Sequence, residues 1–261
     1  MIKAKKSLGQ NFLIDNNILK KITTIAQIQN KSILEIGPGT GNLTSFILNK
    51  NPKKFFVIEK DNQLANLLSD KFKLKLDIIN NDILEIDETT LFNEKVTVFG
   101  NLPYNISTEI ISKWITNLKD EFWFENLILM FQKEVADRIV AKFNTKNYGR
   151  LSILCNWKLN VKKICDIKPE SFSPKPKIDS TLLLFTPKKN FLNIKNPKNL
   201  EIITRTFFNN RRKMLKKPFN KLFNGDKKIL EKLNIDLSLR PQNLQSDIYY
   251  KLASEYENLG S

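Results

Sequence analysis

Seven short apolar stretches, rich in β-branched and aromatic residues, recur along the first 187 residues and have the length of buried strands. The intervals between them mostly carry helical periodicity, as in 107–118, where one face collects Ile and Trp side chains. Strands that alternate with helices predict an α/β fold with a mostly parallel seven-stranded sheet and helices on both faces. The predicted strands are at about 32–36, 54–58, 74–79, 96–99, 127–131, 151–157 and 181–186.

The strand pattern ends near Pro187, and the remaining chain is helical and rich in turns. We therefore predict two domains, one over 1–187 and a small helical one over 188–261. The last two strands of the first domain, 151–157 and 181–186, are close in sequence and are expected to form an antiparallel edge.

A glycine run follows the first predicted strand directly. Gly37, Gly39 and Gly41 lie between that strand and a helical stretch that begins at Asn42. Glycines there let the backbone turn sharply and approach a ligand at the carboxyl edge of the sheet. A dinucleotide fingerprint would place its third glycine at position 42, so the shorter spacing favours a nucleotide-like ligand without a pyrophosphate.

Two carboxylates follow the next strands in the same way. Glu59 ends the second predicted strand, 22 positions after Gly37, which suits a carboxylate that accepts both hydroxyls of a ribose. Asp82 follows the third strand and is predicted to accept a hydrogen bond from an adenine amine.

The segment Asn101-Leu102-Pro103-Tyr104 caps the fourth predicted strand on the same edge. The Asn101 side-chain oxygen and the Leu102 carbonyl are two acceptors for one exocyclic amine, and Tyr104 offers a flat face to a base. Acceptors that draw an adenine amine toward tetrahedral geometry favour its attack on a sulfonium methyl. These residues therefore predict a site that methylates a nucleobase.

Composition excludes several other chemistries. The chain contains no His and only two cysteines, Cys155 and Cys165, so neither a His-assisted nucleophile nor a metal site is predicted. No apolar run is long enough to span a bilayer, and no signal-peptide hydrophobic region follows Met1. We expect a cytoplasmic protein with no membrane association.

The excess of 43 Lys and Arg over 27 Asp and Glu gives a net charge of +16, which favours a polyanionic partner, although compositional drift on solvated faces is an alternative. Basic residues cluster between positions 205 and 217, interleaved with Phe207, Phe208 and Leu215. On a single helix, 205, 212 and 216 would share a stripe suited to phosphates. The residues predicted to bind a nucleic-acid backbone are Arg205, Arg211, Arg212, Lys213 and Lys216, and Lys3, Lys5 and Lys6 add to the same field.

With these residues located, the chain resembles the ribosomal RNA adenine N6,N6-dimethyltransferases, and specifically their small-subunit branch. The resemblance extends over nearly the whole chain. It is carried by the segments Ser7–Leu13, Glu35–Gly41, Glu59–Asp61, Asn81-Asp82, Asn101–Ser107, Gln132–Arg138, Tyr148–Ser152, Phe172–Ser180, Phe207–Leu215 and Arg240–Leu244.

The resemblance implies a Rossmann-like class I methyltransferase fold with S-adenosylmethionine as cofactor and S-adenosylhomocysteine as product. It implies dimethylation of two adjacent adenosines near the 3′ end of 16S rRNA, by a monomer that acts on the immature 30S subunit late in its biogenesis. Asn11 and Leu13 would touch the cofactor, and Phe172 would help to enclose the target base. The implied catalytic residues are Asn101, Leu102, Tyr104 and Phe172, and the implied cofactor-binding residues are Asn11, Leu13, Gly37, Gly39, Glu59, Asp82 and Asn101.

Three alternatives stay open at this point. A non-catalytic small-subunit assembly factor could keep the same fold and bind the same particle. Large-subunit rRNA adenine methyltransferases of the macrolide-resistance type share the catalytic half, and the residues 207–215 and 240–244 favour the small-subunit branch over them. An oxidoreductase is disfavoured by the glycine spacing.

Overall fold

The computed structural model describes residue 5, residues 9–118 and residues 121–259, which form two compact units. Lys3 and Lys6, and Ser7 and Leu8 of the opening segment, lie outside the described residues. Unit 1 comprises residues up to 113, together with 118–136 and 162–187, and unit 2 comprises residues 114–117, 137–161 and those from 188 onward.

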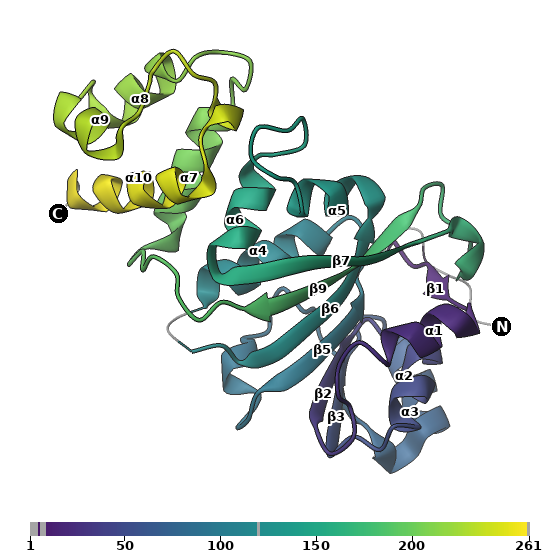
Figure 1. Ribbon diagram of the computed structural model, residues 1–261. Helices are drawn as coiled ribbons and strands as arrows, with labels where there is room; N and C mark the ends of the chain where they lie inside the picture. The colour runs from purple at the N-terminus through teal and green to yellow at the C-terminus, as the bar shows by residue number, and fades with distance from the viewer. Residues whose placement is uncertain (1–4, 6–8, 119–120, 260–261) are drawn as a thin grey trace. The chain divides into compact units, whose positions relative to one another are not determined.

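A seven-stranded sheet organises unit 1 (Figure 1). The five strands from β4 to β6 pair in parallel, and β9 pairs antiparallel with β6. This confirms the predicted, mostly parallel seven-stranded sheet with an antiparallel strand toward one edge. The strand order is β4 (Asp77–Ile79), β3 (Lys54–Ile58), β2 (Ser32–Ile36), β5 (Val96–Asn101), β6 (Phe124–Gln132), β9 (Ser180–Pro187) and β7 (Leu159–Ile167).

Both faces of the central strands are covered. Every residue of β2 is buried, and so are the first five residues of β5, which a sheet exposed on one side would not show. On one face, α1 (Asn16–Ile22), α2 (Asn42–Leu48) and α3 (Asn62–Phe72) pack side by side (Figure 1). Their apolar residues join alternate strand residues in one core cluster that includes Leu19, Ile47, Leu68, Ile33 and Val57.

The carboxyl ends of four strands are level. Ile36 of β2 is in register with Ile58 of β3 and with Gly100 of β5, and Ile58 is in register with Ile79 of β4. The chain runs from β2 out to β4 and then returns to β5 on the other side of β2. Such a reversal of strand order leaves a crevice at the carboxyl edge, where open α/β sheets bind ligands.

A second, two-stranded sheet joins distant parts of unit 1. β1 (Phe12–Leu13) pairs antiparallel with β8 (Phe172–Ser173), and Leu13 is the register partner of Phe172. The ribbon connects the N-terminal segment with the loop that precedes β9.

The predicted strand at 151–157 is wrong, because these residues belong to helix α6 (Arg150–Lys158) and the strand follows as β7. The Ser152 hydroxyl accepts the Gly149 N–H at 2.9 Å and so starts the helix. Six of its nine residues are buried, so its apolar positions form a run rather than a stripe. Periodicity does not distinguish such a buried helix from a buried strand. The predicted strand at 74–79 is also shorter, because residues 73–75 form a turn of 3₁₀ helix.

Two further helices follow strands of the sheet. They are α4 (Ser107–Asn117), after β5, and α5 (Lys133–Ile139), after β6. Helix α4 confirms the helix predicted at 107–118. Short 3₁₀ helices lie at Lys73–Lys75, Glu88–Thr90, Pro169–Ser171 and Pro241–Asn243.

Unit 2 is helical. Phe207 and Tyr249 are fully buried and meet edge to face, 5.8 Å between ring centroids. The Tyr249 hydroxyl donates to the Pro241 carbonyl at 2.6 Å, which satisfies its only polar atom inside the core. No helix among the described residues is both long enough and apolar enough to cross a membrane. After α6, its helices are α7 (Pro197–Phe208), α8 (Lys216–Phe223), α9 (Lys227–Leu233) and α10 (Ser246–Leu259).

Candidate active site

A cavity of about 210 Å³ lies at the carboxyl ends of the parallel strands in unit 1. Its wall includes every predicted cofactor-binding residue and three of the four predicted catalytic residues. These are Asn11, Leu13, Gly37, Gly39, Glu59, Asp82, Asn101, Leu102 and Tyr104.

The glycine turn has a backbone that requires glycine. The backbone φ values are +64° at Gly37, +59° at Gly39 and +77° at Gly41, and residues that carry a Cβ rarely adopt such values. A Cβ on Gly37 would lie 3.8 Å from the Asn101 carbonyl oxygen, and a Cβ on Gly39 would lie 2.6 Å from the Phe12 ring. The turn is therefore packed between the end of β5 and the N-terminal segment, so the predicted donor and acceptor sides of the site are neighbours.

Glu59 directly follows β3 and is 7% exposed. Its two carboxylate oxygens accept the Gly39 N–H at 3.2 Å and the Asp61 N–H at 2.9 Å. Burial raises the pKa of Glu59, and these two hydrogen bonds oppose that shift. A carboxylate has about four acceptor sites, so this one can still accept hydroxyl donors from a ligand.

Asp82 lies on the wall beyond β4 and is already paired with a cation. Lys60 Nζ donates to its Oδ2 at 2.6 Å, and the Leu84 N–H donates to its Oδ1 at 3.0 Å. Partial burial raises the pKa of Asp82, but the bonds from Lys60 and Leu84 outweigh burial, and the pKa is lowered overall. Asp82 is thus an ionised acceptor at neutral pH.

Asn101 ends β5, and its side-chain amide nitrogen donates to the Asn11 carbonyl at 2.7 Å. An amide carries its oxygen opposite its nitrogen, so this bond turns Oδ1 away from Asn11. Leu102 follows with a side chain that is 1% exposed, and its burial fixes the peptide after Asn101. Both residues line the cavity, as the predicted amine-binding pair requires.

Tyr104 is held by its hydroxyl. The residue lines the cavity, and its hydroxyl lies 2.5 Å from the Ser180 hydroxyl at the start of β9. Burial raises the pKa of Tyr104, and the Ser180 bond opposes the shift. The phenol is therefore neutral at neutral pH, and the ring is fixed as a flat surface.

Phe172 does not line the cavity. Its side chain is 3% exposed and belongs to the core cluster beneath β8. Its strand nevertheless supports the wall, because β8 pairs with β1. The Ile14 N–H donates to the Ser171 carbonyl at 2.8 Å, and the Ser171 hydroxyl donates to Asp15 at 3.1 Å.

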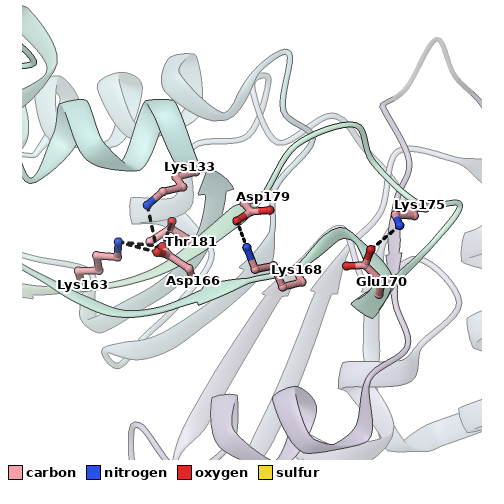
Figure 2. Close-up of polar contacts among 8 residues, drawn as sticks. All are labelled: Lys133, Lys163, Asp166, Lys168, Glu170, Lys175, Asp179 and Thr181. Atoms are coloured by element: carbon pink, nitrogen blue, oxygen red, sulfur yellow. Dashed lines mark hydrogen bonds and ion pairs between the residues drawn. The ribbon is translucent and has the colours of Figure 1, made fainter.

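Ion pairs brace the loop that carries Phe172 (Figure 2). Lys168 pairs with Asp179 at 2.7 Å across the base of the loop, and Lys175 pairs with Glu170 within it. Asp166 next to the loop accepts from Thr181, Lys163 and Lys133 at 2.6, 2.9 and 3.0 Å. These contacts link the base of the loop to the neighbouring strands β7 and β9.

Glu35, the next-to-last residue of β2, was not predicted as a site residue. It lines the cavity, is 2% exposed and accepts the Thr44 hydroxyl at 2.7 Å. Burial raises the pKa of Glu35 to about 8, with Thr44 opposing and Glu59 adding to the shift. The available signal was an acidic residue within an otherwise apolar strand, because carboxylates are seldom fully buried.

Asp61 and Gln10 were also missed. The Asp61 carboxylate, whose side chain is 2% exposed, pairs with Lys5 Nζ at 2.8 Å and accepts Gln10 Nε2 at 3.2 Å. It also accepts the Gln63 N–H at 3.0 Å and so caps α3. An Asp immediately before a helical pattern is a sequence signal for such a cap, but its two N-terminal partners have no signal in the sequence.

The predicted basic stripe does not lie on one helix. Arg205 belongs to α7, which ends at Phe208. Arg212 and Lys213 lie in the turn that follows, and Lys216 is the first residue of α8. Asn209, Asn210 and the short turn after them break the helix. The Arg211 guanidinium donates to the Thr145 carbonyl at 3.1 Å and to the Gln242 side chain at 3.4 Å. Arg205, Arg212, Lys213 and Lys216 are exposed.

Known proteins resemble this chain over its whole length. A family model described as ribosomal RNA adenine dimethylase matches residues 1–258. A protein of Pelagibacter ubique named ribosomal RNA small subunit methyltransferase A is 66% identical over 99% of this chain and 98% of its own length. A Wolbachia protein of the same name is 41% identical over 99% of this chain and 96% of its own length.

A solved structure agrees with these sequences. The dimethyladenosine transferase of Plasmodium falciparum superposes with a TM-score of 0.80 at 28% identity, over 95% of this chain and 98% of its own.

Proposed function

The chain belongs to the ribosomal RNA adenine dimethylase family, which uses S-adenosylmethionine to dimethylate adenines, and on this premise we propose a specific substrate for it. The enzyme transfers methyl groups to the N6 amines of two adjacent adenosines near the 3′ end of 16S rRNA. Two relatives, 66% and 41% identical to this chain, carry names that specify the small ribosomal subunit. Their names support this target over the large subunit.

One observation carries the assignment of the chemistry. The end of β5, with Asn101, and the glycine turn after β2 lie against each other, with a Gly37 Cβ position only 3.8 Å from the Asn101 carbonyl oxygen. A ligand seated on the turn is thus adjacent to the acceptors on Asn101 and Leu102. This closeness is what methyl transfer between two bound molecules requires.

The wall of the cavity fits S-adenosylmethionine. Three positive-φ glycines give the backbone close approach to a ligand, Glu59 offers acceptors to ribose hydroxyls, and Asp82 offers one to an adenine amine. Asn11 and Leu13 close the site from the N-terminal segment. When bound, this cofactor supplies an electrophilic methyl group on a sulfonium.

The residues of this chain act by position and charge. Asn101 Oδ1 and the Leu102 carbonyl accept the two hydrogens of the target amine and direct its lone pair toward the methyl group. Tyr104 stacks on the adenine, and Phe172 supports that side of the pocket through the braced loop. No base removes a proton before attack, because the amine hydrogens become acidic only as the N–C bond forms and the methyl–sulfur bond breaks. One proton then leaves the methylated amine for water. Preorganised acceptors at that point stabilise the developing charge.

We further propose that the substrate is the immature 30S subunit, which a monomer methylates in the cytoplasm late in assembly. Residues 1–187 carry catalysis, and residues 188–261 hold the rRNA. Exposed cations of the second region, Arg205, Arg212, Lys213 and Lys216, contact phosphates. Arg211 belongs to the same surface, with its guanidinium partly engaged by Thr145 and Gln242.

The test is methyl transfer from labelled S-adenosylmethionine to small subunits that lack the modification and, in a parallel reaction, to large subunits, followed by mass spectrometry of both rRNAs. We expect dimethyladenosine at two adjacent positions near the 3′ end of 16S rRNA. Incorporation into large-subunit rRNA instead would contradict the substrate. Binding to the subunits without any incorporation would identify a non-catalytic assembly factor.

A further inference from the structure

Three segments of unit 2 carry eleven basic residues and no acidic ones. They are residues 140–150, 205–221 and 237–245, in a chain that otherwise contains 27 Asp and Glu. Their cations are Lys142, Lys146, Arg150, Arg205, Arg211, Arg212, Lys213, Lys216, Lys217, Lys221 and Arg240. We call these segments the acid-free segments.

Hydrogen bonds join the acid-free segments to one another. The Asn144 N–H donates to the Gln242 carbonyl at 3.0 Å, and Asn243 Nδ2 donates to Asn144 Oδ1 at 2.7 Å. The Leu215 N–H donates to the Leu239 carbonyl at 2.9 Å. The three segments are therefore parts of one surface.

Arg211 is a positioning residue within this surface. Its guanidinium bonds the Thr145 carbonyl of the first segment and the Gln242 side chain of the third, at 3.1 and 3.4 Å. Its neighbours Arg212 and Lys213 stay exposed. Arg211 thus fixes the 142–147 loop, and its neighbours keep their charge available to a ligand.

The 142–147 loop holds an aromatic side chain outward. Phe143 is 43% exposed, although the residues around it are anchored. The Thr145 hydroxyl donates to the Lys142 carbonyl at 2.6 Å, and Asn144 adopts a φ of +65° between its two partners. A single exposed apolar residue needs no explanation by itself, but Phe143 belongs to a pinned loop in which exposed Lys142 and Lys146 precede and follow it in sequence, which gives this one a specific setting.

We propose that Phe143 stacks on an unpaired base of the rRNA substrate while Lys142, Lys146 and Arg212 contact the adjacent phosphates. Aromatic rings among basic side chains bind single-stranded RNA in this way, because every base has a face on which to stack. The absence of Asp and Glu from the three segments matches a polyanion rather than a protein surface of mixed charge. The inference rests on the proposed rRNA substrate, and it assigns a second contact point in unit 2, separate in sequence from the residues that line the cavity.

The experiment measures binding of the full-length protein to unmethylated small subunits and to a single-stranded oligoribonucleotide of about 12 nucleotides, within the site sizes of single-strand-binding folds. Phe143→Ala is expected to weaken oligonucleotide binding roughly 5- to 150-fold, the range for losing one stacked base. Phe143→Trp is expected to bind like the wild type, and its added fluorescence should be quenched by the RNA. Leu192→Ala, which removes a side chain of similar exposure at 42%, is the matched control and should bind normally.

Salt dependence separates the ring from the charges. Phe143→Ala should leave the slope of log affinity against log salt unchanged, whereas Arg212→Gln should reduce it by roughly 0.7 to 0.9. An oligonucleotide with abasic positions throughout should bind wild type and Phe143→Ala equally, because it offers no base to the ring. Thermal melting of Phe143→Ala should stay close to that of the Leu192→Ala control, since the two side chains are similarly exposed, at 43% and 42%.

Wild-type affinity of Phe143→Ala for both ligands would overturn the proposal, as would an equal loss on the abasic strand. Weaker binding to subunits with unchanged binding to all naked RNA would assign Phe143 to a ribosomal protein and also overturn it. Methyl transfer by Phe143→Ala should need a higher subunit concentration to reach half its maximal rate, in line with the weaker binding. If the wild type itself transferred no methyl groups, the proposed activity would be contradicted. The RNA-binding comparison of Phe143→Ala with the wild type would still test the stacking proposal.

Discussion

The Asn101 side-chain nitrogen donates a hydrogen bond to the Asn11 carbonyl oxygen at 2.7 Å, across 90 positions of sequence. The residue proposed to grip the target amine is therefore oriented by the segment proposed to cover the cofactor. The two ends of the amide have different tasks, because the nitrogen anchors the side chain and the oxygen is left to act as acceptor.

Asn101→Ala should reduce turnover on the order of 10²-fold, the usual loss on removing one preorganised electrostatic contact. Cofactor binding should change much less, because the glycine turn, Glu59 and Asp82 are untouched. Single-turnover methyl transfer and calorimetry with S-adenosylmethionine measure the two quantities. Near-normal turnover would remove Asn101 from the mechanism.

Glu59→Gln should weaken S-adenosylmethionine binding roughly 10- to 100-fold, the cost of losing hydrogen bonds to a charged group. In the wild type the two carboxylate oxygens of Glu59 accept the N–H groups of Gly39 and Asp61. The NH2 group of a glutamine at this position would face one of these N–H donors and could not accept from it. Glu94→Gln, which alters an exposed ion pair with Lys53, is the control and should bind normally by calorimetry. Equal affinities in the two variants would contradict the role of Glu59.

Gly39→Ala should lower the melting temperature and abolish measurable cofactor binding. A φ of +59° costs an L-residue about 1–2 kcal/mol, and the new Cβ would lie 2.6 Å from the Phe12 ring. Adding Phe12→Leu removes the ring and should restore part of the stability but not the backbone cost. If Gly39→Ala binds the cofactor like the wild type, the turn is not the cofactor cradle.

Tyr104→Phe keeps the ring and removes the hydroxyl that meets Ser180. We expect turnover to fall less than about tenfold, whereas Tyr104→Ala should lose roughly 5- to 150-fold, as for one stacked base. Steady-state rates on unmethylated subunits measure both variants. Equal losses would mean that the hydroxyl, and not the ring, is what the reaction uses.

Glu35→Gln should stabilise the protein increasingly as pH rises. Burial raises the pKa of Glu35 to about 8 in the folded protein, against 4.5 ordinarily. Between these values the folded state binds more protons than the unfolded chain, so the wild-type free energy of unfolding falls as pH rises. The free energy of unfolding of the variant does not fall in this way. By pH 8 it should exceed that of the wild type by on the order of a few kcal/mol.

Denaturant unfolding at several pH values between 5 and 8 tests the prediction, with Glu125→Gln, at an exposed ion pair with Lys31, as control. Parallel stability curves for Glu35→Gln and the wild type would show that Glu35 titrates normally.

The central strands and the site were predictable from sequence because each chemical group directly follows an apolar strand. The glycine turn, Glu59 and Asn101 occur at strand ends, and the carboxyl ends of parallel strands share an edge. The pattern therefore predicted, without any knowledge of the loops, that these residues would line one cavity.

The rest depended on contacts between distant residues. Residues 151–157 are mostly buried and carry no single apolar stripe, which hides a helix from periodicity. The helix break after Phe208 falls at Asn209 and Asn210, which are weaker helix formers than the Arg, Lys, Met and Leu residues that follow them. The bonds of Arg211 to Thr145 and of Asp61 to Lys5 join loops whose approach only the folded chain determines.

The common height at which β2, β3, β4 and β5 finish makes the enzyme unevenly tolerant of insertions and deletions. Extra residues in the crossover loops on the far edge of the sheet leave all four ends aligned. One residue gained or lost inside any of these strands reverses which face each following side chain occupies and moves one group out of line with the others. Evolution of this enzyme is thus free to change the length of the chain at one edge of the sheet and is held to a fixed count within the strands.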